Sequence, residues 1–312
     1  MDIVVAGGTG FIGRRLCQLL HHHGHRVSIL TRSHKEVERL FGTTIQAIEW
    51  DAAQSGLWEE SLRGVQAVVN LTGEPIADAR WTEHRKRVIT YSRILPTRLL
   101  VQACSRLSVK PSVFINASGI GFYGLQDDQM LDESNGPGKG FLADLCMQWE
   151  SEAQVAAVHG LRVVCIRTGM VLENDGGALP RMALPFRLFA GGPVMPGTQW
   201  VSWIHRDDLA GLIEWAITRS TVSGPLNAVA PSPVTMAVFC NTLGKALRRP
   251  CWFPVPEFLL KAALGELGSL MTTGQRVMPV KAITSGYVFQ YPTLEDALRA
   301  VFKKPAPVGH AV

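Results

Sequence analysis

The stretch Ala6-Gly7-Gly8-Thr9-Gly10-Phe11-Ile12-Gly13 decides the fold of this chain. Residues 2–6 before it are an apolar run that predicts a buried strand, and residues 10–23 have the spacing of a helix. Glycine permits a tight turn at position 7, close approach of a pyrophosphate at position 10, and packing of the helix on the strand at position 13. Residues 7–13, with Thr9, Phe11 and Ile12 among them, are therefore the expected phosphate-binding loop, at the amino terminus of a helix.

Short apolar runs alternate with helical stretches through the first half of the chain. Further strands are expected at residues 26–31, 67–71, 112–117 and 162–167, with a helix at 141–159 between the last two. Such alternation is typical of parallel strands joined by crossover helices. We predict an α/β fold: a Rossmann-type doubly wound parallel sheet with a small carboxy-terminal substrate lobe.

The character of the sequence changes after the last of these strands. Gly176-Gly177, Gly191-Gly192-Pro193 and Pro196-Gly197 divide the following region into loops. Residues 1–170 are expected to form the cofactor-binding domain, with its sheet completed by parts of residues 200–230. Residues 171–312 are expected to form mainly the substrate lobe and a carboxy-terminal region, in which 250–299 is predicted to be largely helical.

Composition and charge exclude several classes of protein. Of the 312 residues 46% are hydrophobic and 18% charged, and no apolar run approaches the roughly 18 residues of a membrane-spanning helix. The net charge of +5 comes from scattered basic residues and one cluster at 80–93, which is more often a solvated helix face or a phosphate site than a nucleic-acid surface. We expect a small-molecule substrate, no nucleic-acid or membrane partner, and a monomer or homodimer.

The cysteines and histidines give no sign of a metal site. The six cysteines lie far apart without a CxxC pair, which is typical of reduced core residues. The histidines of residues 21–25 are nearly consecutive, so their side chains diverge and indicate an exposed helix end. The glycine motif begins too early to leave room for a secretory leader before it, and we expect a cytoplasmic protein without bound metal.

The end of the second predicted strand indicates which dinucleotide binds. An NAD-specific protein usually carries an acidic residue there, whereas this chain has Arg32, followed by Ser33. A guanidinium suits a 2′-phosphate by charge and by its fork of donors, which favours NADP(H). Asp51 is placed to bond the adenine amino group, and Leu71-Thr72-Gly73 follows the strand at 67–71.

Motifs over nearly the whole chain resemble the extended short-chain dehydrogenase/reductases of the NAD(P)-dependent epimerase/dehydratase group. The resemblance is closer still to a branch labelled epimerase family protein, which has a carboxy-terminal domain of unknown function. The motifs are GGTGFIG (7–13), TR (31–32), NLTGEPIADARW (70–81), ASGIGFYG (117–124), RTGMVL (167–172), PFRLFAGGP (185–193), WIHRDDLA (203–210) and GPLNAVAP (224–231). The resemblance implies cofactor contacts at the glycine loop, Arg32, Leu71, Thr72 and Arg93, to which we add Gly73 and Arg167.

The resemblance also brings out a departure from the superfamily's usual chemistry. A Tyr-x-x-x-Lys pair normally exchanges a proton with the substrate while hydride moves to or from nicotinamide. With Glu150 as the anchor of the predicted helix, Leu142 and Cys146 take these two positions. Tyr123 and Ser118, which follow the strand at 112–117, are the candidate catalytic residues in their place. Tyr123 serves either as a proton donor or substrate clamp, or as a ring packed over the nicotinamide.

The loop-rich region supplies the candidate substrate ligands Arg187, Gln199 and Trp203, with Arg80 and Trp81 on the opposite wall. His205 is expected to be structural. We predict an NADP(H)-dependent oxidoreductase or epimerase that acts on a small polar molecule. The alternative is a non-catalytic NADP(H)-binding sensor or partner-binding protein, which the missing Tyr-Lys pair supports.

Overall fold

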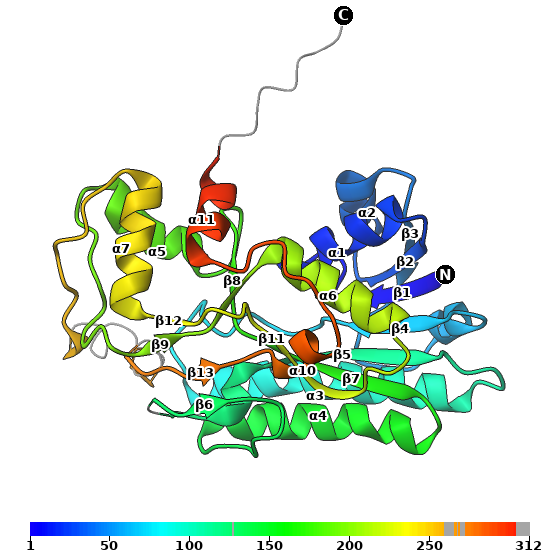
Figure 1. The fold of residues 1–312 in the computed structure, drawn as a ribbon. Helices are drawn as coiled ribbons and strands as arrows, with labels where there is room; N and C mark the ends of the chain where they lie inside the picture. Colours follow the sequence, from blue (N-terminus) through cyan, green and yellow to red (C-terminus); the bar gives the residue numbers. More distant parts are fainter. Residues whose placement is uncertain (127, 259–264, 267, 269–271, 304–312) are drawn as a thin grey trace, which may run out of the picture.

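The computed structural model describes residues 1–126, 128–258, 265–266, 268 and 272–303 (Figure 1). A seven-stranded sheet with the order β3-β2-β1-β4-β5-β7-β11 runs through the larger part of the molecule, and all its pairings are parallel. Its strands are β1 (Asp2–Ala6), β2 (Arg26–Thr31), β3 (Gln46–Glu49), β4 (Ala67–Asn70), β5 (Val113–Gly119), β7 (Arg162–Thr168) and β11 (Gly224–Ala228). The chain leaves β1 toward one edge and returns at β4 toward the other, and ligands of doubly wound sheets bind at the carboxyl ends of the strands at such a switch point.

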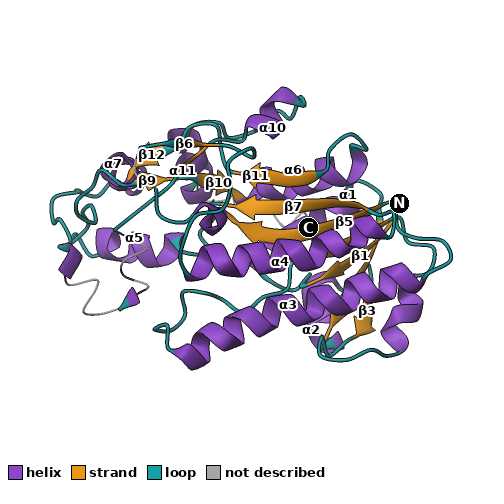
Figure 2. Cartoon of the chain, turned by 90° about the horizontal axis from the view of Figure 1, so that it is seen from below, coloured by secondary structure: helices purple, strands orange, loops and turns teal. Residues whose placement is uncertain are grey.

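Helices cover both faces of this sheet because both faces of its strands are apolar. Ile3 and Val5 of β1 belong to the core beneath α1 (Phe11–His22), α2 (His34–Phe41) and α6 (Arg206–Thr218). Val4 and Ala6 belong to the core beneath α3 (Glu83–Arg106) and α4 (Phe141–Val158). Figure 2 shows α3 and α4 side by side across the second face.

A second, smaller core lies beyond the carboxyl ends of the strands. It is built around Phe186, Trp203 and Phe239 and joins α5 (Leu179–Arg187), α7 (Met236–Leu247) and α11 (Leu294–Phe302). Short pairings complete it: β8 (Met170–Leu172) with β10 (Trp203–His205), and β9 (Trp200–Val201) with β12 (Val234–Thr235). The remaining elements are η1 (Leu57–Leu62), η2 (Ile120–Tyr123), β6 (Met130–Leu131), β13 (Arg276–Val277) and α10 (Val280–Thr284).

The predicted fold class is confirmed, and each predicted strand lies within two residues of its predicted bounds. In the described part of residues 250–299 loops prevail, with helix at residues 257–258, 266 and 268, in α10 and at the start of α11; that the whole segment is largely helical stays a prediction. Pro254, Pro256, Pro279 and Pro292 explain the loops, since proline lacks the N–H that a helix interior needs. Residues 259–264, 267 and 269–271 of that segment lie outside the described residues.

The domain boundary at residue 170 stays a prediction. Within the described ranges, no helix is both long and apolar enough to cross a membrane.

Candidate cofactor-binding and active site

The glycine turn between β1 and α1 is closed by backbone contacts that leave no room for side chains. Gly7 has φ +80°, and a Cβ on it would lie 2.7 Å from the carbonyl oxygen of Leu71. A Cβ on Gly13 would collide with the carbonyl oxygen of Gly7. The amide of Gly10 donates to the same Gly7 oxygen at 3.1 Å. These contacts account for glycine at positions 7 and 13: they hold the first turn of α1 against the glycine turn, and the glycine turn against Leu71 after β4.

The amino terminus of α1 is open to an anion. Its N-cap, Gly10, has extended backbone and supplies no side-chain hydrogen bond to the helix. The N–H groups of the first turn therefore point toward the carboxyl end of β1 with no side chain capping them, and the helix dipole favours negative charge there. Such a turn suits an anion, and its role as the pyrophosphate-binding loop stays a prediction.

Arg32 lies exposed where β2 ends, and it makes no hydrogen bond or ion pair with any residue that the structure describes. Ser33 is used differently, because its hydroxyl caps α2 by accepting from the amide of Glu36 at 3.3 Å. Arg32 therefore keeps all its side-chain donors for a phosphate beyond the end of β2, whereas the Ser33 hydroxyl is held at the cap of α2 by the bond that it accepts.

The Asp51 carboxylate forms hydrogen bonds within its own loop. One carboxylate oxygen accepts from the amides of Ala53 at 2.6 Å and Gln54 at 3.1 Å, and the other accepts from the side chain of Gln54 at 2.9 Å. These bonds shape the turn after β3. The carboxylate is exposed, and its contact with adenine stays a prediction.

The segment after β4 is held by a buried polar cluster that the sequence analysis missed. Asn70 accepts from the amide and hydroxyl of Thr72 and donates to Thr97 and Asn116, both at 2.8 Å. Trp149 donates to the same Thr97 hydroxyl at 2.8 Å. The signal in the sequence was an asparagine at the same register in two neighbouring apolar strands, Asn70 at the end of β4 and Asn116 within β5. The cluster fixes Leu71, Thr72 and Gly73 beside the glycine turn.

Arg93 of α3 reaches the same edge of the sheet. Its guanidinium donates to the carbonyl oxygens of Ile89 and Glu74, both at 3.0 Å, and lies over the ring of Trp149. Burial lowers the pKa of Arg93 to about 10. Gly73 leaves the space it needs, since a Cβ there would lie 2.8 Å from the guanidinium carbon. A half-buried cation bonded to neutral carbonyls is suited to an anionic or hydroxyl-bearing ligand.

The two positions of the missing pair lie beside the end of β5 and the η2 turn that follows it. A Cβ on Gly121 would lie 2.9 Å from Leu142, and one on Gly119 would lie 3.8 Å from the sulfur of Cys146. Burial raises the pKa of the Cys146 thiol, which keeps it neutral. The place of the usual phenol and ammonium therefore holds an apolar side chain and a neutral thiol.

Tyr123 and Ser118 belong to a buried network beneath this position. Ser118 donates to Glu150 at 2.7 Å, and Glu150 forms a bidentate pair with Arg167 at 2.8 Å for each bond. Arg167 also donates to the Tyr123 hydroxyl at 3.1 Å, and that hydroxyl donates to the Asn227 side chain at 2.7 Å. The Tyr123 side chain is 0% exposed, and burial raises its pKa.

This network corrects three sequence-based interpretations. The Tyr123 hydroxyl and the Ser118 hydroxyl are already bonded within the protein, so neither is presented to a substrate. The Tyr123 ring lies in the core with Phe122, not over a nicotinamide surface. Arg167 is 4% exposed and bound to Glu150, so these contacts give its side chain a structural role rather than one against the cofactor.

The three predicted substrate ligands do not converge. Trp203 is 0% exposed in the core of the smaller lobe and donates to the Ser232 carbonyl, which contradicts a direct substrate contact. Gln199 is buried and donates to the Val194 carbonyl at 3.0 Å. Arg187 is exposed and donates to Asn174 at 2.8 Å. Sequence reasoning placed all three in the covering loops but could not tell inward from outward side chains.

His205 is structural, as the sequence analysis expected. It is buried, its ring accepts from the amide of Asp207 at the start of α6, and it stacks on Tyr291. Burial lowers its pKa to about 4, so the ring is neutral at ordinary pH.

Cationic and aromatic side chains gather at the start of α3 and just before it. Trp81 packs edge-on against Phe141 and donates to the Ile76 carbonyl. Lys86 lies over the same Phe141 ring and pairs with Glu266 at 2.7 Å. Arg80 is exposed nearby in the chain. The basic cluster of residues 80–93 is thus the start of α3, beside the carboxyl end of β4.

Residues 173–177 cross over the first turn of α1, which the sequence analysis did not foresee. A Cβ on Gly176 would lie 2.5 Å from the ring of Phe11. Arg206 stacks on that ring and pairs with Glu173 at 3.0 Å and Asp175 at 2.5 Å. The segment therefore packs on the Phe11 side chain at the start of α1, and the Gly176-Gly177 pair was its signal in the sequence.

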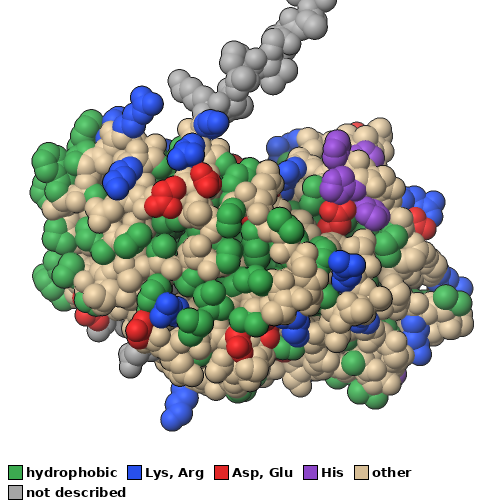
Figure 3. All heavy atoms as spheres, viewed as in Figure 1, with side chains coloured by type: hydrophobic (Ala, Val, Ile, Leu, Met, Phe, Trp, Pro, Cys, Tyr) green, Lys and Arg blue, Asp and Glu red, His purple; other side chains and the backbone are tan. Residues whose placement is uncertain are grey.

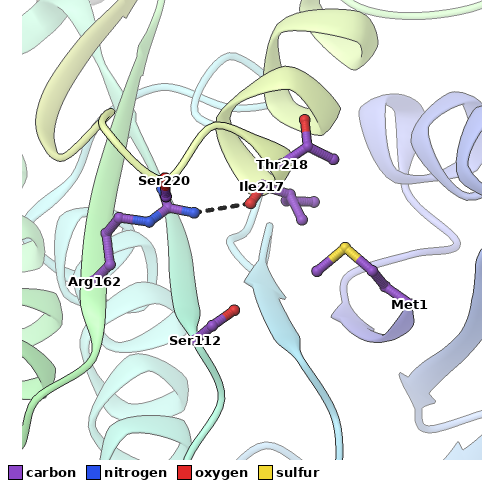
Figure 4. Close-up of a pocket in the computed structure, with 6 residues that line it drawn as sticks. All are labelled: Met1, Ser112, Arg162, Ile217, Thr218 and Ser220. Atoms are coloured by element: carbon purple, nitrogen blue, oxygen red, sulfur yellow. Dashed lines mark hydrogen bonds between the residues drawn. The ribbon is translucent and has the colours of Figure 1, made fainter.

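A hollow at the other end of the sheet is unrelated to this site. Figure 4 shows its lining, in which Arg162 donates to the Ile217 carbonyl at 2.8 Å and Met1 and Ser112 lie nearby. Met1, Ser112 and Arg162 stand where β1, β5 and β7 begin. Ligands of doubly wound sheets bind at the carboxyl ends of the strands, so this hollow is not the cofactor site.

The fold and the glycine turn define a dinucleotide-binding protein of the doubly wound α/β class. Residues 3–228 match the NAD dependent epimerase/dehydratase family, and residues 255–301 match a domain of unknown function, DUF1731. The chain belongs to this epimerase/dehydratase family, the group of the extended short-chain dehydrogenase/reductases that the sequence motifs resemble.

Individual relatives agree with this assignment. The chain is 42% identical over 311 residues to the chloroplastic epimerase family protein SDR39U1 homolog of Arabidopsis thaliana, covering 97% of this chain and 87% of the relative. It is 41% identical to the epimerase family protein YfhF of Bacillus subtilis, covering 96% and 97%. The crystal structure of human epimerase family protein SDR39U1 with NADPH is 36% identical, with a TM-score of 0.86 and coverage of 96% and 99%. A UDP-glucuronic acid 4-epimerase from Bacillus cereus, 19% identical with a TM-score of 0.78, shares the fold.

Proposed function

We propose that this chain binds NADP(H) at the carboxyl ends of β1, β2 and β4 and acts as an oxidoreductase or epimerase on a small polar molecule. The observation that carries the proposal is the open amino terminus of α1, with the exposed Arg32 at the end of the next strand. The first suits the pyrophosphate and the second the 2′-phosphate. The human relative crystallised with NADPH supports the same cofactor.

The residues of the chain suggest how the rest of the cofactor is held. Leu71, Thr72 and Gly73 stand where the nicotinamide half would pass, and Arg93 presents a cation between α3 and α4. When bound, the cofactor supplies or accepts hydride. Arg93, Lys86 and Arg80 give the opposite side positive charge, which favours a substrate with polar or anionic groups.

The buried network favours a second candidate, a non-catalytic NADP(H)-binding sensor or partner-binding protein. Leu142 cannot exchange a proton, Cys146 is held neutral, and the Tyr123 hydroxyl is taken up by Arg167 and Asn227. A catalyst built on this site would need an acid other than Tyr123. The cytoplasmic location and the monomer or homodimer state stay predictions.

One experiment tests the proposal and separates the two candidates. NADPH and NADH affinities are measured by calorimetry, and NADPH absorbance at 340 nm is then followed with panels of carbonyl compounds and nucleotide sugars, with Gly10→Val as the control. Tighter binding of NADPH and substrate-dependent oxidation above the control support the oxidoreductase. An epimerase returns its hydride and leaves no net change at 340 nm, so the configuration of each nucleotide sugar is also followed by NMR. Tight binding with neither NADPH oxidation nor a change of configuration supports the sensor, and equal weak binding of both cofactors refutes the cofactor assignment.

A further inference from the structure

The outer end of the smaller lobe carries an exposed apolar surface that the cofactor site does not use. Figure 3 shows hydrophobic side chains gathered over the end of the molecule formed by α5 and α7, with Lys and Arg beside them. The lobe-end surface is defined by five side chains that are between 55% and 69% exposed: Leu184, Leu188, Phe189, Trp252 and Phe253. Single exposed apolar residues are ordinary, but a group of large ones marks an interaction site.

The members of this surface are neighbours in space. Leu184 and Leu188 are one helical turn apart at the end of α5, where the amide of Leu188 donates to the Leu184 carbonyl. The amides of Trp252 and Phe253 both donate to the carbonyl of Gly191, two residues beyond Phe189. The two aromatic rings lie 6.1 Å apart. The five side chains therefore come from two segments that are hydrogen-bonded to each other.

The segments that carry the lobe-end surface are basic, although Asp78 pairs with Arg181 at 2.8 Å and Glu257 follows Phe253 by four residues. Residues 176–198 and 229–256, which carry all of it, contain no Asp or Glu. Their cations are Arg181, Arg187, Lys245, Arg248 and Arg249. Arg249 stacks on Phe189, 4.4 Å from the ring centroid. Of these cations, Lys245, Arg248 and Arg249 form no ion pair with any residue that the structure describes.

The backbone is strained at the same place. Phe189 has φ +61° and Arg248 has φ +57°, conformations that L side chains rarely adopt and that helix ends normally give to glycine. Both side chains are thereby held at the surface. Strained positions that persist outside the core point to a function of the side chain.

We propose that the lobe-end surface docks on a membrane surface that carries anionic headgroups. Exposed Trp, Phe and Leu side chains bordered by Lys and Arg suit the interface, where rings enter the headgroup region and cations meet lipid phosphates. A second copy of this chain would bring like charges together, which disfavours self-association here. Leu184 and Leu188 cannot stack on bases, which disfavours a nucleic acid. The composition of the chain predicted no membrane partner because no segment can span a bilayer, but docking on a membrane surface needs no spanning segment.

The test uses the full chain with vesicles of phosphatidylcholine alone or mixed equally with phosphatidylglycerol, measured by co-sedimentation. We expect binding to the mixed vesicles that weakens as salt rises. Arg248→Glu/Arg249→Glu should weaken it by about tenfold or more, since each basic residue near an anionic surface contributes about 1 kcal/mol. Trp252→Ser/Phe253→Ser should also weaken it, whereas Leu57→Ser, an exposed apolar position on η1, should not.

NADPH affinity, which should be unchanged in every variant, shows that each remains folded. No binding of the wild type to mixed vesicles overturns the proposal, as does equal binding by the wild type and both double variants. If the wild type forms a dimer or a nucleic-acid complex that the double variants lose and Leu57→Ser keeps, the surface belongs to that partner instead.

Discussion

Tyr123→Phe tests whether the one phenol near the end of β5 supports the structure or the chemistry. The substitution keeps a ring that is 0% exposed and removes a hydroxyl with two partners. That hydroxyl donates to Asn227 at 2.7 Å and accepts from the Arg167 guanidinium at 3.1 Å. Without it, a buried amide oxygen and a buried cation each lose a partner.

The expected loss of stability follows from these two bonds. A buried neutral hydrogen bond contributes about 0.5 to 1.5 kcal/mol and one to a charged group about 1.5 to 3 kcal/mol, so we expect the free energy of unfolding to fall by roughly 2 to 4 kcal/mol. Tyr287→Phe is the matched control. Its hydroxyl donates a single neutral bond to the Asp208 carbonyl at 2.9 Å, so its loss should be about 1 kcal/mol.

Urea denaturation of the wild type and both variants measures these losses, with an unchanged m-value as the check that the same transition is compared. NADPH affinity of folded Tyr123→Phe should equal that of the wild type. If a substrate is known, turnover per folded molecule should also be unchanged. A variant as stable as the wild type that has lost its turnover refutes the structural role and returns Tyr123 to the chemistry.

Three further predictions concern the phosphate sites and pH. Arg32→Ala should weaken NADPH binding about tenfold or more without changing NADH binding, because it removes the partner of the 2′-phosphate. Calorimetry measures both affinities, with Arg63→Ala as the control. The same loss of NADPH affinity in Arg63→Ala would contradict the assignment. Gly10→Val should abolish NADPH binding, because the branched side chain would enter the space of the phosphates. The circular dichroism spectrum should stay native, because the backbone φ of −73° at position 10 is open to any residue. Normal NADPH binding by the variant would refute the assigned loop. His205 has a folded pKa of about 4, below its unfolded value near 6.5, so only the unfolded state gains a proton between these values. Its contribution to stability is therefore present above pH 6.5 and falls by about 2 kcal/mol by pH 5. His205→Asn should flatten this part of the stability profile in urea titrations at pH 7 and 5, and an unchanged slope would count against it.

Local sequence was sufficient for the sheet and the phosphate loop. The strand at 2–6, the glycines at 7, 10 and 13 and the helix after them depend on neighbouring residues, on backbone conformation and on a period that can be counted. The position of Arg32 follows from the strand that ends beside it. The absence of the usual Tyr-Lys pair is likewise a matter of counting along one helix.

Tertiary structure decided the direction in which side chains point and the partners they meet. Tyr123, Glu150, Arg167 and Asn227 come from four separate elements, so nothing in any one segment shows that they satisfy each other. Trp203 falls in a loop-rich region, yet only the packing of α5, α7 and α11 shows that it is core. The lobe-end surface likewise exists because a hydrogen-bonded crossing brings Phe189 and Trp252 together from distant parts of the chain. Periodicity in the sequence predicts one helix or strand at a time, whereas burial and charge pairing depend on how separate helices and strands pack together.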